Sequence, residues 1–151
     1  HAIVNSIDLV DKDDSNRVTK GRDCFHIFYS RFRRAYKIRP KQEDARQVSV
    51  QVQLNEIYME FYRSHSSELG HYFRSLYNIV KFVKNNEVEN KSLYTNLVRA
   101  QLSSFELLLI FYNCLSEMGR EKFKPLTVEF HLLKHLQSQN LLDPNHASLY
   151  S

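Results

Sequence analysis

Two rows of polar side chains are the residues of this sequence whose types and spacing could carry chemistry. Members of each row are three, four or seven residues apart, so each row lies on one face of a helix. If the rows meet, an imidazole, guanidinium groups and a carboxylate could transfer protons or form a buried hydrogen-bonded seam. The alternative is that each row is the solvated side of its helix, and periodicity leaves both interpretations open. The rows are His71, Arg74 and Asn78, and Arg99, Ser103, Glu106 and Asn113.

A buried seam would require ion pairing, because a buried charge without a partner costs several kcal/mol. We therefore predict that Glu106 is mostly buried and bonded to Arg74, Arg99 or His71. The hypothesis of an acid-base set acting on RNA uses His71, Arg74 and Glu106, and it requires these side chains to converge at an open cleft. The candidate polar seam comprises His71, Arg74, Arg99, Gln101, Glu106 and Asn113.

A second candidate site is a basic run, with six cations in eleven residues interleaved with Phe32 and Tyr36. Such a run could bind nucleic acid or anionic lipid, and the net charge of +4 permits a partner that carries phosphate. Alternatively, the cations stabilise the C-terminal end of their own helix through its dipole. The candidate anion-binding residues are Arg31, Arg33, Arg34, Lys37 and Arg39, followed by Lys41.

Patterns for metal, cofactor or catalytic sites are weak. His131 and His135 are four residues apart, but the HExxH arrangement is absent and no cysteine pair assists them. Three glycines leave little room for a phosphate-binding loop, and the Arg-to-His spacing typical of helical HEPN-type ribonucleases is missing. We predict no metal and no cofactor, and enzymatic activity is unsupported. Cys24 and Cys114 lie in apolar runs, which is typical of packed thiols and fits a reducing cytoplasm.

The element that must position the second row is the stretch 94–116, which has no Gly or Pro and is apolar over most of a helical circumference. A helix of this kind is typical of the centre of a bundle. Arg99 and Glu106 argue against a membrane span, since ionised side chains facing lipid are costly. We predict one continuous central helix over 94–116, ended by Gly119 in the left-handed closing position.

Four further helices are predicted around it, over residues 21–38, 43–63, 68–84 and from Pro125 through Leu136. Pro40 ends the first of them, and Pro125 suits the first position of the last. Together they predict an all-α, single-domain bundle of about five helices. The organisation is an entry segment over 1–20, a helical domain over 21–142 and a loose C-terminal tail over 143–151.

Several short motifs, taken in order, resemble a family. They are His71-Tyr72-Phe73-Arg74-x-Leu76-Tyr77, then Tyr94, Arg99-Ala100-Gln101-Leu102-Ser103, Glu106-Leu107, Tyr112-Asn113 and Lys122-Phe123-Lys124-x-Leu126. The family is that of the AbiC-like putative phage abortive infection proteins, and the resemblance covers roughly residues 21–142. The sequence departs from it at Phe130, where the family pattern has Tyr.

The resemblance implies a helical cytoplasmic domain in bacterial defence against phage, in a family whose members often carry membrane-spanning helices upstream. We expect an interaction or sensor module with no chemistry of its own; the alternative is a toxin that targets RNA, or a helical domain that binds nucleic acid. A phage or host protein is the expected partner. Self-association, and a membrane anchor upstream of this chain, are left open, as are the phage trigger and the identity of the partner.

Overall fold

The computed structural model describes residues 8–10, 18–21, 23–39 and 49–151. Within these residues the chain forms seven α-helices, two short 3-10 helices and one two-stranded hairpin. The predominantly helical architecture is therefore as predicted, although the helices are more numerous and shorter than the expected five. The elements are β1 Asp8–Val10, β2 Val18–Lys20, α2 Asp23–Ile38, α3 Val50–Ser64, α4 Ser66–Asn85, α5 Lys91–Gln101, α6 Ser104–Leu115, α7 Phe123–Glu129, η1 Ser138–Asn140, η2 Pro144–His146 and α8 Ala147–Tyr150.

The hairpin of β1 and β2 was not predicted. The strands are antiparallel, with Asp8 opposite Lys20 and Val10 opposite Val18. Gly21 follows β2 with a φ of 61°, a left-handed conformation that favours glycine, and the chain then enters α2. A strand of three residues is too short for alternation to reveal it, so the sequence carried little signal for this element.

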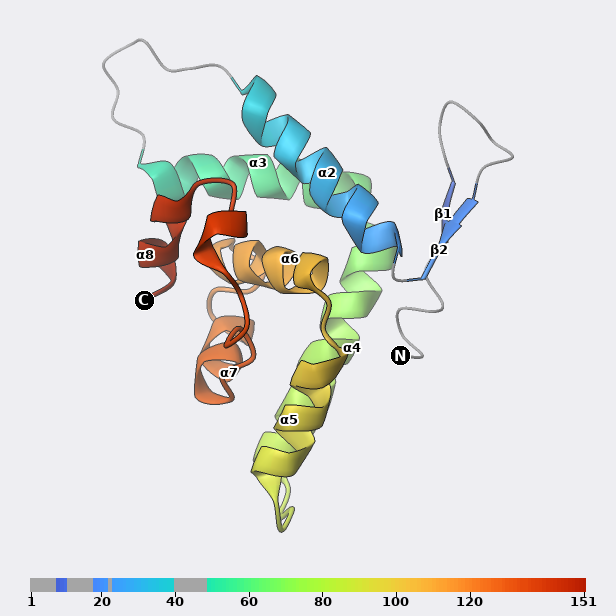
Figure 1. Cartoon of the computed structure of the whole chain (residues 1–151), viewed down its shortest axis with the longest axis vertical. Coiled ribbons are helices and arrows are strands. Elements are labelled where there is room, and N and C mark those ends of the chain that lie inside the picture. The colour runs from blue at the N-terminus through green and yellow to red at the C-terminus, as the bar shows by residue number, and fades with distance from the viewer. Residues whose placement is uncertain (1–7, 11–17, 22, 40–48) are drawn as a thin grey trace.

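Helix α6 lies at the centre of the core. Every residue from Glu106 to Leu115 is buried, and α2, α3 and α7 all pack against this helix (Figure 1). Phe32 of α2 places its ring 5.1 Å from that of Tyr112 and 5.6 Å from that of Tyr58 on α3, both edge-on. The prediction of a buried central helix is confirmed for this part of the stretch.

The single helix predicted over 94–116 is wrong, because the chain breaks between α5 and α6 at Leu102 and Ser103. Ser103 caps α6: its hydroxyl accepts from the Glu106 amide, and the Glu106 carboxylate accepts from the Ser103 amide. This capping box satisfies two amides that a new helix would otherwise leave unpaired. Leu97, expected in the core, is 55% exposed as a result.

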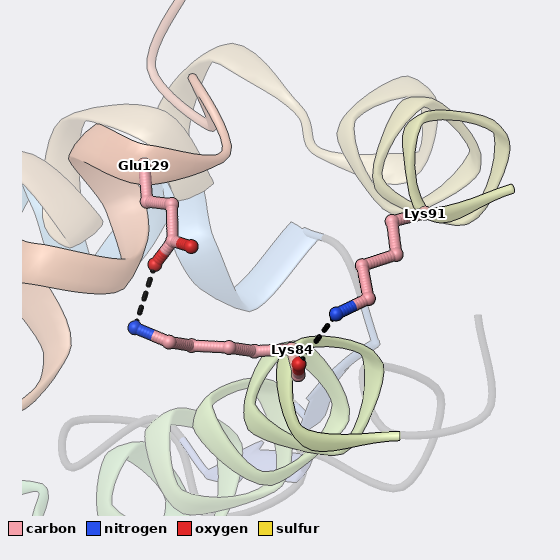
Figure 2. Close-up of polar contacts among 3 residues, drawn as sticks. All are labelled: Lys84, Lys91 and Glu129. Carbon is pink, nitrogen blue, oxygen red and sulfur yellow. Dashed lines mark hydrogen bonds and ion pairs between the residues drawn. The ribbon is translucent and has the colours of Figure 1, made fainter. Parts of the chain in front are cut away.

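Helices α4 and α5 form an antiparallel arm that extends away from α2 and α3 (Figure 1). Helix α4 agrees with the predicted range 68–84. Lys91 donates from Nζ to the Lys84 carbonyl at 2.6 Å across the turn, and the Lys84 ammonium lies 2.8 Å from the Glu129 carboxylate at the end of α7 (Figure 2). Both charged side chains are nearly half exposed, so this ion pair orients α7 against the arm more than it stabilises the fold.

The C-terminal third differs most from prediction. Helix α7 ends at Glu129 instead of continuing to Leu136, and His131 takes a φ of 51° that a helix cannot accommodate. Gly119 does not close α6 in a left-handed conformation; Ser116 caps that helix, and a Cβ on Gly119 would lie 2.4 Å from Asn113 Oδ1. A glycine is needed there because the backbone passes too close to Asn113 for any side chain.

The tail beyond residue 142, expected to be loose, packs on α6. His146 is buried, and the Tyr112 hydroxyl lies 2.9 Å from its Nδ1. The same hydroxyl accepts from the Leu142 amide at 2.8 Å. Tyr150 then packs its ring 5.6 Å from that of Phe111. These contacts make residues 142–150 part of the core packing.

Helix α3 begins at Val50, and the predicted helical residues 43–48 lie outside the described part of the chain.

Candidate functional site

Glu106 is the best buried member of the predicted polar seam. Its side chain is fully inaccessible to solvent, as predicted. Its partners differ from the prediction: the Tyr72 hydroxyl donates to Glu106 Oε1 at 2.9 Å, and the Ser103 amide donates to Oε2 at 2.8 Å. Tyr72 is itself fully buried on α4. The carboxylate therefore ties α4 to the start of α6 and does not open onto a cleft.

Arg99 lies apart from Glu106. Its guanidinium donates to Asn96 Oδ1 at 3.0 Å and to the Phe130 carbonyl at 2.8 Å. Within the described part of the chain, its buried Nε has no hydrogen-bond partner. Arg99 thus connects α5 to the end of α7 through its hydrogen bond to Phe130. The predicted pairing with Glu106 is not formed. Gln101, at the end of α5, is exposed.

The remaining seam residues separate as well. His71 and Arg74 are exposed on α4, whereas Asn113 is buried on α6. Asn113 Nδ2 donates to the Tyr58 hydroxyl at 2.8 Å. Burial raises the pKa of Tyr58 far above its usual value, so this hydroxyl stays neutral and accepts the bond. The six residues do not form one continuous seam, and His71, Arg74 and Glu106 do not converge on one accessible point.

Two of the predicted residues, Arg74 and Asn113, line the same pocket, which we call the motif pocket. It has a volume of about 280 Å³ and lies between α4, the C-terminal end of α6 and the start of α7. Most of its lining comes from the motifs that carry the family resemblance. The lining residues are Tyr62, Gly70, Phe73, Arg74, Tyr77, Asn113, Met118, Lys122 and Phe123.

Aromatic side chains form one wall of the motif pocket. Phe123, the first residue of α7, places its ring 6.4 Å from that of Phe73 and 6.3 Å from that of Tyr77, edge-on in both pairs. Edge-to-face pairs at these separations are favourable, so they hold α7 against α4. Phe73 and Tyr77 lie one helical turn apart on α4, which is the spacing that puts both on the same face.

Cations provide the polar part of the pocket. Arg74 comes from α4 and Lys122 from the loop before α7, and both are exposed. Among the described residues, neither makes a salt bridge with an acidic side chain. Gly70 lies one turn before Arg74, and a Cβ there would be 2.9 Å from both Arg74 Nη1 and the Tyr62 hydroxyl. The guanidinium therefore lies over the glycine, beside a phenol.

The basic run on α2 is outside this pocket. Arg33, Arg34 and Lys37 are exposed on the outer side of the helix. Arg31 Nη1 lies 3.4 Å from His65 Nε2, and the Arg39 guanidinium stacks 3.5 Å above the centre of the Tyr36 ring. Two of the five cations thus have local structural contacts, and whether the run binds an anion stays a prediction. Lys41 lies outside the described residues.

A larger cavity of about 590 Å³ lies between α6, α7 and the C-terminal segment, lined mainly by apolar side chains such as Phe111, Leu133 and Leu141. His131 and Lys134 also line it. His131 and His135, which are four residues apart in the sequence, both follow the end of α7 and do not form a helical pair. In the part of the chain that the structure describes, no group of three or more potential ligands could hold a metal ion.

Of the nine residues that line the motif pocket, sequence reasoning named Arg74 and Asn113 as site residues and missed the other seven. Lys122 and Phe123 belong to one of the recognised motifs, so motif membership was the available signal. Gly70 also carried a sequence signal, because a glycine inside a helical pattern costs about 1 kcal/mol relative to alanine and often has a packing or functional reason.

The fold and this pocket define a helical domain in which residues of three recognised motifs, 71–77, 112–113 and 122–126, line one pocket. The model of the family described as "Putative phage abortive infection protein" matches residues 64–141, which is just over half of the chain. The chain belongs to this family, and the family indicates a role in phage abortive infection. All of the pocket's lining residues except Tyr62 fall inside the matched range.

Comparisons with curated proteins and with solved structures give no match. Among the helices in the described residues, none has both the length and the apolar character that crossing a bilayer requires.

Proposed function

We propose that this domain is an interaction module of an abortive infection protein, and that it contacts a phage or host protein through one face of the α4–α5 arm. The observation that carries the proposal is a set of large apolar side chains left exposed on the arm. Exposed apolar surface that is contiguous is typical of protein interaction sites. The residues are Ile79, Phe82, Leu93, Tyr94 and Leu97, which are 41–64% exposed.

The helical repeat places these side chains on one face. Phe82 directly precedes the buried Val83 on α4, and Tyr94 directly precedes the buried Thr95 on α5. Two antiparallel helices are related by a twofold axis. Residues that lie at the same angle around each helix, measured from the interface between the helices, are therefore on the same side of the pair. Ile79 lies on this side of α4, three residues before Phe82. Leu97 lies on this side of α5, three residues after Tyr94.

The other side of the arm is covered. Helix α7 contacts α4 through Phe123 on Phe73 and Tyr77, and through the Lys84–Glu129 ion pair. On the helical repeat, Tyr77 and Lys84 lie across the Val80–Val83 interface from Ile79 and Phe82. The apolar face is therefore the side of the arm that α7 leaves uncovered.

The alternative of an RNA-targeting toxin has less support. Acid-base catalysis needs its groups within hydrogen-bond reach of one reacting atom. Glu106 is sealed in the core with Tyr72, while His71 and Arg74 are exposed on α4. This separation favours binding over catalysis. A cytoplasmic location and a membrane anchor upstream of the chain stay predictions.

The test is phage plaque formation on cells that express the natural protein, compared with Phe82→Ser and Leu97→Ser variants. We expect both variants to lose protection while the melting temperature of the domain stays nearly constant, because exposed substitutions usually change stability by no more than about 0.5 kcal/mol.

Val50→Ser and Val52→Ser are matched controls, since these valines are 51% and 49% exposed on α3, away from the arm. They should protect like the wild type. Full protection by both arm variants would refute the arm as the interaction surface. Absence of protection by the wild-type protein in a host and phage panel would refute the abortive infection role for this protein.

A further inference from the structure

The motif pocket has the composition of a site for a small organic anion. Its walls are largely aromatic, from Phe73, Tyr77 and Phe123, and its charged groups are Arg74 and Lys122. Apolar pockets with a few polar groups that converge are the usual form of small-molecule sites. Here the charged groups are both cations, and among the described residues no acidic side chain pairs with either.

Arg74 lies against Gly70 at the pocket. Its Nη1 lies 2.9 Å from the point that a Gly70 Cβ would occupy, and the Tyr62 hydroxyl lies 2.9 Å from the same point. An alanine at position 70 would have to displace both groups. A glycine that costs helix stability is thus what allows the guanidinium to lie against the helix at the pocket, next to the Tyr62 hydroxyl.

The volume of the motif pocket and the charge of its lining limit the class of ligand that it can bind. A volume of about 280 Å³ is just below the range of about 300–1,000 Å³ that holds drug-sized molecules. A mononucleotide is of the corresponding size. Arg binds phosphate or carboxylate through a planar fork of donors, a lysine adds a second positive charge, and aromatic side chains provide stacking surfaces for a base.

We propose that the motif pocket binds a nucleoside monophosphate or a similar phosphorylated aromatic metabolite, with its phosphate at Arg74 and Lys122 and its ring against Phe73, Tyr77 and Phe123. This site is separate from the apolar face of the arm, so the two proposals can fail independently. It adds a ligand-sensing function to a domain that otherwise acts by contacting a protein.

The test is titration of the whole 151-residue chain by calorimetry and by NMR shift mapping. The probes are AMP, UMP, adenosine, ribose 5-phosphate and inorganic phosphate. We expect AMP or UMP to bind more tightly than adenosine, which lacks the charge, and more tightly than ribose 5-phosphate, which lacks the ring. Shifts should map to the pocket, and affinity should fall as salt concentration rises.

Variants locate the site. Arg74→Gln and Lys122→Gln should each raise the Kd about tenfold or more, because a hydrogen bond to a charged group contributes at least that factor. Gly70→Ala should weaken binding while leaving the melting temperature unchanged or raised, since alanine favours the helix but displaces the guanidinium. Arg120→Gln removes a cation from the same loop outside the pocket lining and should bind like the wild type.

Three results would overturn the proposal. The first is the absence of measurable binding by both nucleotides at millimolar concentration. The second is adenosine binding as tightly as AMP. The third is an affinity that Arg74→Gln and Arg120→Gln reduce equally, which would indicate nonspecific attraction to a basic surface. If ribose 5-phosphate or inorganic phosphate binds as tightly as AMP, the aromatic wall has no role and the proposed ligand class is wrong.

Discussion

Replacing Glu106 by alanine should destabilise the domain by about 2–5 kcal/mol. The change removes the carboxylate that accepts from the Tyr72 hydroxyl at a fully buried position, and loss of a hydrogen bond to a charged group costs about 1.5–3 kcal/mol. It also removes the carboxylate half of the capping box on Ser103, and loss of a cap costs about 0.5–2 kcal/mol. The two losses occur at opposite oxygens of one side chain, so both contribute.

Urea denaturation of wild type and variant measures this difference. Glu106→Gln keeps an acceptor and nearly the same volume, so it should cost less than Glu106→Ala. Tyr72→Phe removes the donor alone. In the double-mutant cycle of Glu106→Ala with Tyr72→Phe we expect a coupling energy of about 1.5–3 kcal/mol, the range for a hydrogen bond to a charged group.

Glu121→Ala is the matched control, because this carboxylate is exposed in the loop before α7; its effect should stay within about 0.5 kcal/mol. A loss below about 1 kcal/mol in Glu106→Ala would refute the argument that this carboxylate is a structural link between α4 and α6. A coupling energy near zero would refute the Tyr72 contact as the source of the loss.

Two further predictions follow from close packing and burial. Gly119→Ala should lower stability in thermal melts by at least about 1–3 kcal/mol, because its Cβ would lie 2.6 Å from the Asn113 carbonyl oxygen; unchanged melting would contradict the close approach. Burial lowers the pKa of His146, so unfolded chains bind more protons and the free energy of unfolding should fall as pH drops below about 6.5, the unfolded value. His146→Gln should lack this part of the pH dependence, and an identical pH profile would contradict it.

Helices with strong amphipathic periodicity were the predictable part of the fold. The polar and apolar rows of α4 gave its range to within two residues at each end, and the density of apolar residues around Leu108 and Phe111 correctly indicated burial. These features depend on local spacing, so no knowledge of the partner element was needed. The abortive infection family was likewise recognisable from the order of its motifs.

The break between α5 and α6 could have been read from the sequence. Ser103-Ser104-Phe105-Glu106 has the S-x-x-E pattern of a capping box before an apolar run. Apolar periodicity on both sides concealed it, because Leu97 and Leu108 fit one uninterrupted helix equally well. The exposed Leu97 shows that periodicity identifies an apolar stripe without showing that a neighbour covers it.

Hydrophobic spacing in the sequence determined that this chain would be mainly helical and that its most apolar stretch would lie at the centre. Only the tertiary structure decided which polar residues meet. Glu106 bonds to Tyr72 from 34 positions away, and Arg74 lies beside Tyr62 in a pocket that it shares with Lys122. Helical periodicity specifies the face on which a side chain lies, but its partner depends on how separate helices cross and on loops such as the one that passes close to Asn113, where a glycine has to be.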